Sequence, residues 1–111
     1  MREIKFRAWD GNRFIKYEEL KNYPFKNIID KLGYTMEQYT GLKDKNGKDI
    51  YEHDYCKNPD GTIIFIVWKD FGFKAISIEI VDGKKLRIPL GNLGNYLISN
   101  CEIIGNIHEQ A

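Results

Sequence analysis

One uninterrupted apolar segment limits what this chain can fold into more than any other feature. Residues Thr62–Trp68 are all β-branched or aromatic, which favours a strand, and the lack of any charged residue predicts burial on both faces. Asp70, Phe71 and Gly72 then read as a turn. The following segment, Phe73–Ile80, alternates apolar and polar residues as a half-buried strand does. The centre of the chain therefore predicts an antiparallel hairpin inside a larger sheet.

Strand and turn signals recur on both sides of this hairpin. Further strands are expected at Ile4–Trp9, Phe14–Tyr17, Glu37–Thr40, Ile50–Tyr51, Tyr55–Cys56, Leu86–Ile88 and Cys101–Ile107, the last with a bulge at Gly105. Asp44–Gly47 is typical of a tight turn, because Asn and Gly tolerate positive φ. Pro89 places the strand before it at a sheet edge, or ends it. Short strands at this spacing favour a barrel or sandwich over βαβ units.

One segment has helical rather than strand periodicity. Pro24 suits a first helical turn, and the apolar residues Phe25, Ile28, Ile29 and Leu32 fall at i, i+3, i+4 and i+7. Gly33 follows where a C-terminal cap is expected. The predicted fold is mainly β, a small open barrel or sandwich with one short helix. The strand that begins after Asp54 is similar in part to an SH3-like barrel strand.

Length and charge limit the class of protein further. A chain of 111 residues predicts one domain, covering residues 1–111, with a core of its own. Lys and Arg number 17 against 16 for Asp and Glu, which excludes a polybasic tail or a strongly charged domain but not a local basic patch. No apolar run is long enough for a membrane span, and the first residues lack a signal peptide's apolar core. We expect a cytoplasmic protein that does not contact membranes.

Metal binding has one candidate set. His53 and Cys56, together with Cys101 and His108, would supply two thiolates and two imidazoles for tetrahedral zinc if their segments paired. The spacing between Cys101 and His108 is irregular for such a site, and buried reduced thiols explain the cysteines equally well. We therefore expect no metal and no cofactor, and leave open whether the four side chains converge.

Two other functions have weaker support. Lys5, Arg7 and Trp9 should share one face of the first strand, where cations and a ring could stack on single-stranded nucleic acid. Asp49, Glu52 and Asp54 could act as acid and base in a hydrolase if they converged in a pocket. No nucleophile motif accompanies them. Nucleic-acid binding and carboxylate-dependent hydrolysis remain the alternatives to a non-enzymatic binding module.

Three segments of the chain carry a family resemblance. They are Ile4–Asp10, Gln38–Glu52 and Cys101–Ile107, of which the central block is long and specific. On these segments the chain is similar to the YopX family of small phage and prophage proteins. The chain has His53 where the family favours glycine, which implies a tight backbone position there, and Cys56 where the family favours valine.

The resemblance implies a mainly β fold, a bacteriophage or prophage origin in a bacterial host cell, and no catalytic residue that can be transferred. Together with the balanced charge, it favours an accessory protein that binds a host or phage protein without catalysis. Seven Tyr and two Trp are available for an interface. The candidate binding residues are Arg7, Trp9, Tyr39, Lys43 and Tyr51. Exposed strand edges also make self-association into a homo-oligomer an expectation.

Overall fold

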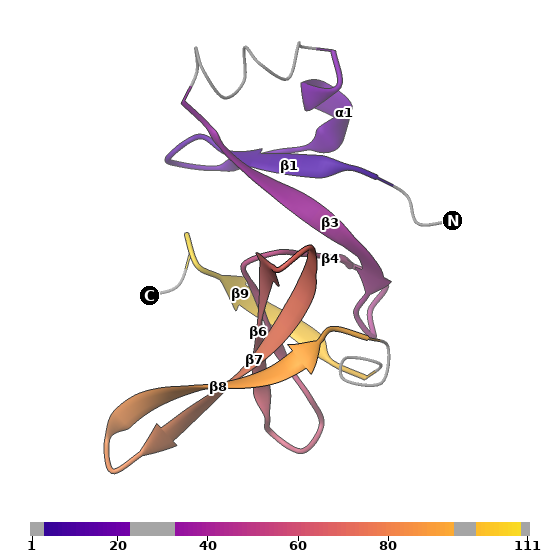
Figure 1. Cartoon of the computed structure of the whole chain (residues 1–111). Helices are drawn as coiled ribbons and strands as arrows, with labels where there is room; N and C mark the ends of the chain where they lie inside the picture. Colours follow the sequence, from indigo (N-terminus) through magenta and orange to yellow (C-terminus); the bar gives the residue numbers. More distant parts are fainter. Residues whose placement is uncertain (1–3, 23–32, 95–99, 110–111) are drawn as a thin grey trace.

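The computed structural model describes residues 4–22, 33–94 and 100–109. Within these ranges it contains nine strands and one short helix (Figure 1). The elements are β1 (Phe6–Trp9), β2 (Phe14–Ile15), α1 (Tyr17–Leu20), β3 (Thr35–Lys43), β4 (Asp49–Tyr51), β5 (Asp54–Lys57), β6 (Ile63–Lys69), β7 (Gly72–Val81), β8 (Lys84–Asn92) and β9 (Glu102–Asn106). The prediction of a mainly β fold is confirmed.

The first sheet has the order β2-β1-β3-β4. The long strand β3 pairs antiparallel with β1 along its first half and with β4 along its second half. The register with β4 shifts between Tyr39 and Lys43, where Gly41 has a φ of +89° that glycine adopts without strain. The predicted Asp44–Gly47 turn connects β3 to β4. β3 therefore extends from the β1–β2 end of the molecule to the second sheet.

The second sheet is curled and has the order β8-β7-β6-β5-β9, all antiparallel. The central position of β6 explains its uninterrupted apolar sequence, because Ile64, Phe65 and Ile66 are buried in succession. The prediction of burial on both faces is wrong at the end of the strand, where Trp68 lies beyond the core and is 44% exposed. β8 lies at one edge of this sheet, as expected from Pro89. β9 lies at the other edge and has the predicted bulge next to Gly105.

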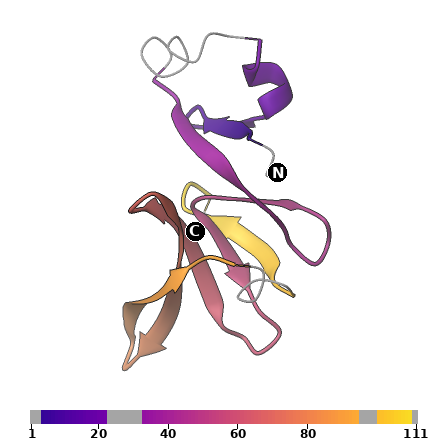
Figure 2. The same cartoon turned by 45° about the vertical axis from the view of Figure 1, so that its right-hand side comes forward.

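The two sheets are offset along the length of the molecule, and the β7–β8 hairpin extends away from the β1–β3 end (Figures 1 and 2). Each end has its own apolar cluster. One consists of Ile50, Cys56, Ile64, Ile66, Phe73, Ala75 and Cys101, and the other of Ala8, Ile15 and Leu20. The turn residue Asp44 also connects the sheets, because its Oδ2 accepts a hydrogen bond of 3.1 Å from the backbone N–H of Ile103.

The helical region differs from the sequence prediction in two ways. The predicted helix from Pro24 to Leu32 lies outside the described residues. The predicted strand Phe14–Tyr17 ends at Ile15, and a single helical turn follows at Tyr17–Leu20. That turn buries Leu20 against Ala8 and Ile15, which a continued strand would not do. Among the described residues, no helix has the length and apolar character needed to cross a membrane.

Candidate functional site

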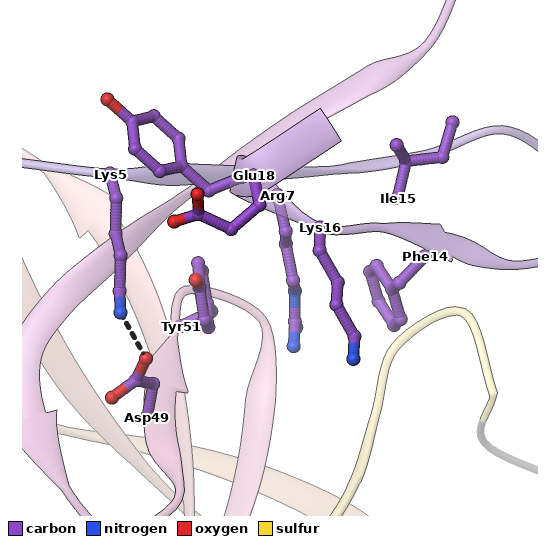
Figure 3. Close-up of a pocket in the computed structure, with 9 residues that line it drawn as sticks. Lys5, Arg7, Phe14, Ile15, Lys16, Glu18, Asp49 and Tyr51 are labelled. Atoms are coloured by element: carbon purple, nitrogen blue, oxygen red, sulfur yellow. Dashed lines mark ion pairs between the residues drawn. The ribbon is translucent and has the colours of Figure 1, made fainter. Parts of the chain in front are cut away.

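A pocket of about 360 Å³ opens between β1, β2, α1 and β4. Its lining mixes cations with rings: Lys5, Arg7, Phe14, Ile15, Lys16, Tyr17, Glu18, Asp49 and Tyr51. Figure 3 shows Lys5, Arg7 and Lys16 extending in parallel from the β1–β2 side, with Tyr51 and Asp49 facing them from β4. Lys5 Nζ is 2.5 Å from Asp49 Oδ2, so that charge has a partner within the chain.

Arg7 occupies the boundary between this pocket and the interior. Its Nε and Nη2 each lie 2.9 Å from Glu37 Oε1, and Nη2 also lies 2.7 Å from Asp54 Oδ1. The guanidinium carbon is 3.9 Å from the centre of the Phe14 ring and 4.5 Å from that of Tyr51. Arg7 therefore pairs with two carboxylates inside the fold, and two aromatic rings cover the faces of its guanidinium.

Glu37 is fully buried at the junction of the two sheets, where four donor atoms surround it. Its Oε1 faces Arg7. Its Oε2 accepts from His53 Nδ1 at 2.7 Å and from His108 Nε2 at 2.9 Å. Burial alone would raise the pKa of Glu37, but the His53 hydrogen bond and the Arg7 charge outweigh burial and lower it. The same hydrogen bond raises the pKa of His53. Glu37 is therefore a buried carboxylate held in its ionised form.

The backbone fixes His53 tightly. Its φ is +71°, in the left-handed region, and its N–H donates to the Ile66 carbonyl at 2.6 Å. Its carbonyl accepts from the N–H of Ile107 at 3.0 Å, and its ring stacks on Phe65 with centroids 6.0 Å apart. The prediction of a tight backbone position at residue 53 is confirmed. A glycine would adopt this φ without cost, which explains why glycine suits the position.

Two aromatic rings of the first sheet hold His108. Trp9 stacks on the imidazole with centroids 4.9 Å apart and an angle of 10° between planes. Phe14 meets the same imidazole edge-on at 5.8 Å. The backbone N–H of His108 donates to Asn106 Oδ1 at 2.8 Å, so His108, two positions after the end of β9, is anchored at backbone and ring. We call Glu37, His53 and His108 the junction cluster.

The five binding residues expected from the sequence do not form one exposed surface. Arg7 and Trp9 contact the junction cluster. Tyr39 is buried, contacts Tyr51 with ring centroids 5.6 Å apart, and has the Lys5 ammonium 4.7 Å from its centre. Lys43 is exposed and paired with Asp49. Arg7 and Trp9 share a face of β1 with Lys5, the residue before the strand, as predicted, but that face packs on the rest of the molecule.

The four residues considered for zinc separate into two pairs. Cys56 and Cys101 are fully buried neighbours in the apolar core, with both thiols reduced. His53 and His108 meet at Glu37. The two-thiolate, two-imidazole arrangement therefore does not form, because the cysteines face the core side of the second sheet while the histidines face the junction.

The three carboxylates considered for hydrolysis have separate partners. Asp49 pairs with Lys5 and Lys43, while Glu52 accepts from the backbone N–H of Gln38 at 2.9 Å. Asp54 pairs with Arg7 and accepts from the Tyr51 N–H at 2.9 Å. Asp49 and Asp54 both line a second pocket of about 380 Å³, but Glu52 does not. No shared acid–base cluster results.

A different surface lies on the second sheet, near the turn of the β7–β8 hairpin. A groove of about 190 Å³ is lined by four isoleucines together with one ring and one cation, namely Ile63, Ile78, Ile80, Ile104, Tyr55 and Lys85. We call it the isoleucine groove. Ile80 is 68% exposed and Ile104 48% exposed. All nine residues of β8 are exposed as well.

The fold defines a class of small, mainly β proteins, and the comparisons place the chain within it. A sequence model described as "YopX protein" matches residues 13–111, so the chain belongs to the YopX family. The crystal structure of protein EF1440 from Enterococcus faecalis is similar, with a TM-score of 0.52 and 22% sequence identity. That match covers 98% of this chain and 96% of EF1440, and it shows a shared fold. No curated protein matches the chain.

Sequence reasoning missed both Glu37 and the isoleucine groove. The only available signal for Glu37 was a charged residue inside a predicted extended segment. The groove draws its residues from five different strands, β5 to β9, so no local pattern contains it.

Proposed function

We propose that this chain is a phage or prophage accessory protein that binds another protein through the isoleucine groove, in the cytoplasm of a bacterial host. Membership of the YopX family supports the phage assignment. The observation that carries the binding assignment is the groove itself. Four isoleucines line it, and two of them, Ile80 and Ile104, are about half exposed or more. Apolar side chains left open to water in a hollow are typical of a site that a partner covers.

The charges around the groove indicate the chemistry of the partner. Lys85 lies over the Tyr55 ring at 5.6 Å, and Arg87 lies over the Phe65 ring at 5.3 Å. Within the described residues neither cation has an acidic partner. A segment that places an apolar side chain in the groove and a carboxylate beside it would satisfy both features. The proposed partner therefore offers an apolar residue next to Asp or Glu.

The geometry of the hairpin supports an extended segment as the bound form. β8 is a nine-residue edge strand at the side of the sheet next to the groove, and its outer edge has no neighbouring strand in the described part of the chain. Pro89 and the lysines on this strand oppose pairing with a copy of the same cationic edge. They do not oppose a strand of the opposite charge. The proposed mode is thus an acidic, extended segment beside β8 with its apolar side chain in the groove.

A pull-down with matched variants tests the proposal. Tagged protein is used to capture partners from phage-infected host lysate, with half of each sample treated with nuclease, and the bound proteins are quantified by mass spectrometry. Ile80→Glu places a charge in the groove at an exposed position, so the fold is retained. We expect this variant to capture at least about tenfold less of the partner protein than the wild-type chain does. Ile107→Glu is the control, since Ile107 is 45% exposed but lies outside the groove.

Each outcome has a definite meaning. A protein that survives nuclease, is lost in Ile80→Glu and is kept in Ile107→Glu supports the proposal. Equal loss in both variants, or no loss in either, contradicts it. Capture that disappears with nuclease favours the nucleic-acid alternative instead, and recovery of untagged copies of this chain favours self-association. The absence of catalysis stays a prediction.

A further inference from the structure

We propose that the junction cluster is a metal site in which Glu37, His53 and His108 bind one divalent transition-metal ion, with Zn²⁺ the best match. Two imidazoles and one carboxylate are a ligand set that Zn²⁺ commonly takes in proteins, with a fourth position left for water. Nothing in the family assignment or in the relatives supplies this site. The sequence alone did not favour it, because it paired the histidines with cysteines and left out Glu37.

The positions of the donor atoms support a shared ion. Glu37 Oε2, His53 Nδ1 and His108 Nε2 all lie within 4.8 Å of one another. Bonds of about 2.1 Å in a tetrahedral site would hold the ligand atoms about 3.4 Å apart. The two glutamate–histidine distances, 2.7 and 2.9 Å, need to widen by about 0.7 and 0.5 Å respectively for such bonds. The ion would take the place of the hydrogen at each contacting ring nitrogen; each neutral imidazole then carries its one proton on its other ring nitrogen, so no net proton is released.

The surroundings already orient the ligands in the way that a metal site requires. Arg7 binds Oε1 of Glu37, which leaves Oε2 aimed at the two imidazoles. Phe65 stacks on the His53 ring, and Trp9 stacks on the His108 ring. Partners of this kind fix the direction of a ligand atom before the ion arrives. The cluster would therefore need little reorganisation on binding.

The charge balance also leaves room for a cation. Glu37 and Asp54 are both held by Arg7, and Glu52 Oε2 lies 3.8 Å from His53 Nε2. With neutral imidazoles, three carboxylates and one guanidinium give this region a formal charge of −2. A divalent ion neutralises it. The His53 and His108 side chains are 30% and 19% exposed, so an ion and a water molecule can reach them.

Titration of the untagged full-length chain tests the site. The protein is stripped with a chelator and titrated with ZnCl₂ by calorimetry, and with CoCl₂ by visible absorption. We expect one ion per chain and a cobalt spectrum without a thiolate charge-transfer band. His53 and His108 are the chain's two histidines. The imidazole ¹⁵N resonances of both should therefore shift with Zn²⁺, which identifies the ligands directly.

Three variants separate ligation from local electrostatics. Glu37→Gln removes the carboxylate ligand but risks misfolding, because Glu37 is fully buried. His53→Gly removes an imidazole at a φ of +71°, where glycine is unstrained, so the fold should be retained. We expect either change to weaken Zn²⁺ binding by about 100-fold or more. Glu52→Gln is the control, because it removes a neighbouring charge without removing a ligand, and a loss of a few-fold at most is expected.

The outcomes divide cleanly. One ion per chain that is lost in folded His53→Gly and kept in Glu52→Gln supports the site. Three results would overturn it: no binding by the wild-type chain, binding unchanged in His53→Gly, or a cobalt–thiolate band that identifies Cys56 and Cys101 as the ligands. In any of these cases the junction cluster is a buried hydrogen-bond network between Glu37 and the two histidine rings.

Discussion

The guanidinium of Arg7 on β1 lies 2.7 Å from the carboxylate of Asp54 on β5, and this ion pair joins the first sheet to the second. The same guanidinium holds Glu37 on β3, so one cation on β1 binds the two most buried carboxylates of the described chain. Each of them depends on Arg7 for its charge balance. The contact between the sheets is therefore electrostatic at its centre and aromatic around it.

Replacing Arg7 should be costly for stability. Arg7→Met keeps much of the side chain's volume but leaves Glu37 and Asp54 buried without their cation. The free energy of unfolding should fall by about 3–5 kcal/mol, as is usual when one partner of a buried ion pair is removed. Urea denaturation followed by circular dichroism measures the change. Arg13→Met is the control, since the Arg13–Glu19 pair is exposed and 3.8 Å long, and should cost under about 0.5 kcal/mol.

The β6–β7 turn should gain stability from a glycine. Asp70 and Phe71 have φ values of +53° and +64°, and the Phe71 side chain is 97% exposed. The ring therefore contributes no packing, while its Cβ makes the left-handed conformation unfavourable. Phe71→Gly produces an Asp-Gly turn and should raise the free energy of unfolding by about 1 kcal/mol. A lower melting temperature in this variant would show that the ring has a packing partner after all.

Acid should weaken the turn that connects the sheets. Burial alone would raise the pKa of Asp44, but backbone N–H donors from Ile103, Lys48 and Asn46 outweigh it, so the folded pKa lies below the unfolded value. The stabilisation is therefore present above the unfolded pKa of about 3.9 and is lost as pH falls through the folded pKa.

Asp44→Asn tests this dependence. The variant should be less stable by roughly 1–2 kcal/mol at pH 7 and should lose part of the decline in stability between about pH 5 and 3. Urea midpoints measured at a series of pH values give both quantities. An unchanged acid slope would mean that Asp44 does not contribute to the acid sensitivity.

The two cysteines should be unreactive in the folded protein. Cys56 and Cys101 are fully buried, and the neighbouring thiol together with burial raises the pKa of Cys56. Burial denies the reagent access to both sulfur atoms, so an aromatic disulfide reagent should label neither residue until the chain unfolds. The expected result is about two thiols per chain in denaturant and almost none in buffer. Rapid labelling of the native protein would show that this core opens readily.

The sequence was sufficient for features that depend on neighbouring residues. The burial of β6, the edge position of β8 and the left-handed backbone at His53 all follow from local residue types. Glu37 could not be found in this way, because its partners Arg7, His53 and His108 are 30, 16 and 71 positions away. The sequence also assigned Arg7 and Trp9 to an exposed surface, since alternation along β1 reveals a shared face but not what covers it.

Site-specific photo-crosslinking tests the central claim most directly. A photoreactive phenylalanine analogue is placed at position 80, in the isoleucine groove, or at position 107, outside it, and infected host cells are irradiated. The account predicts an adduct with a protein at position 80 and none at position 107, and the crosslinked segment should contain an apolar residue beside Asp or Glu. No adduct at position 80, equal adducts at both positions, or an adduct with nucleic acid would contradict it.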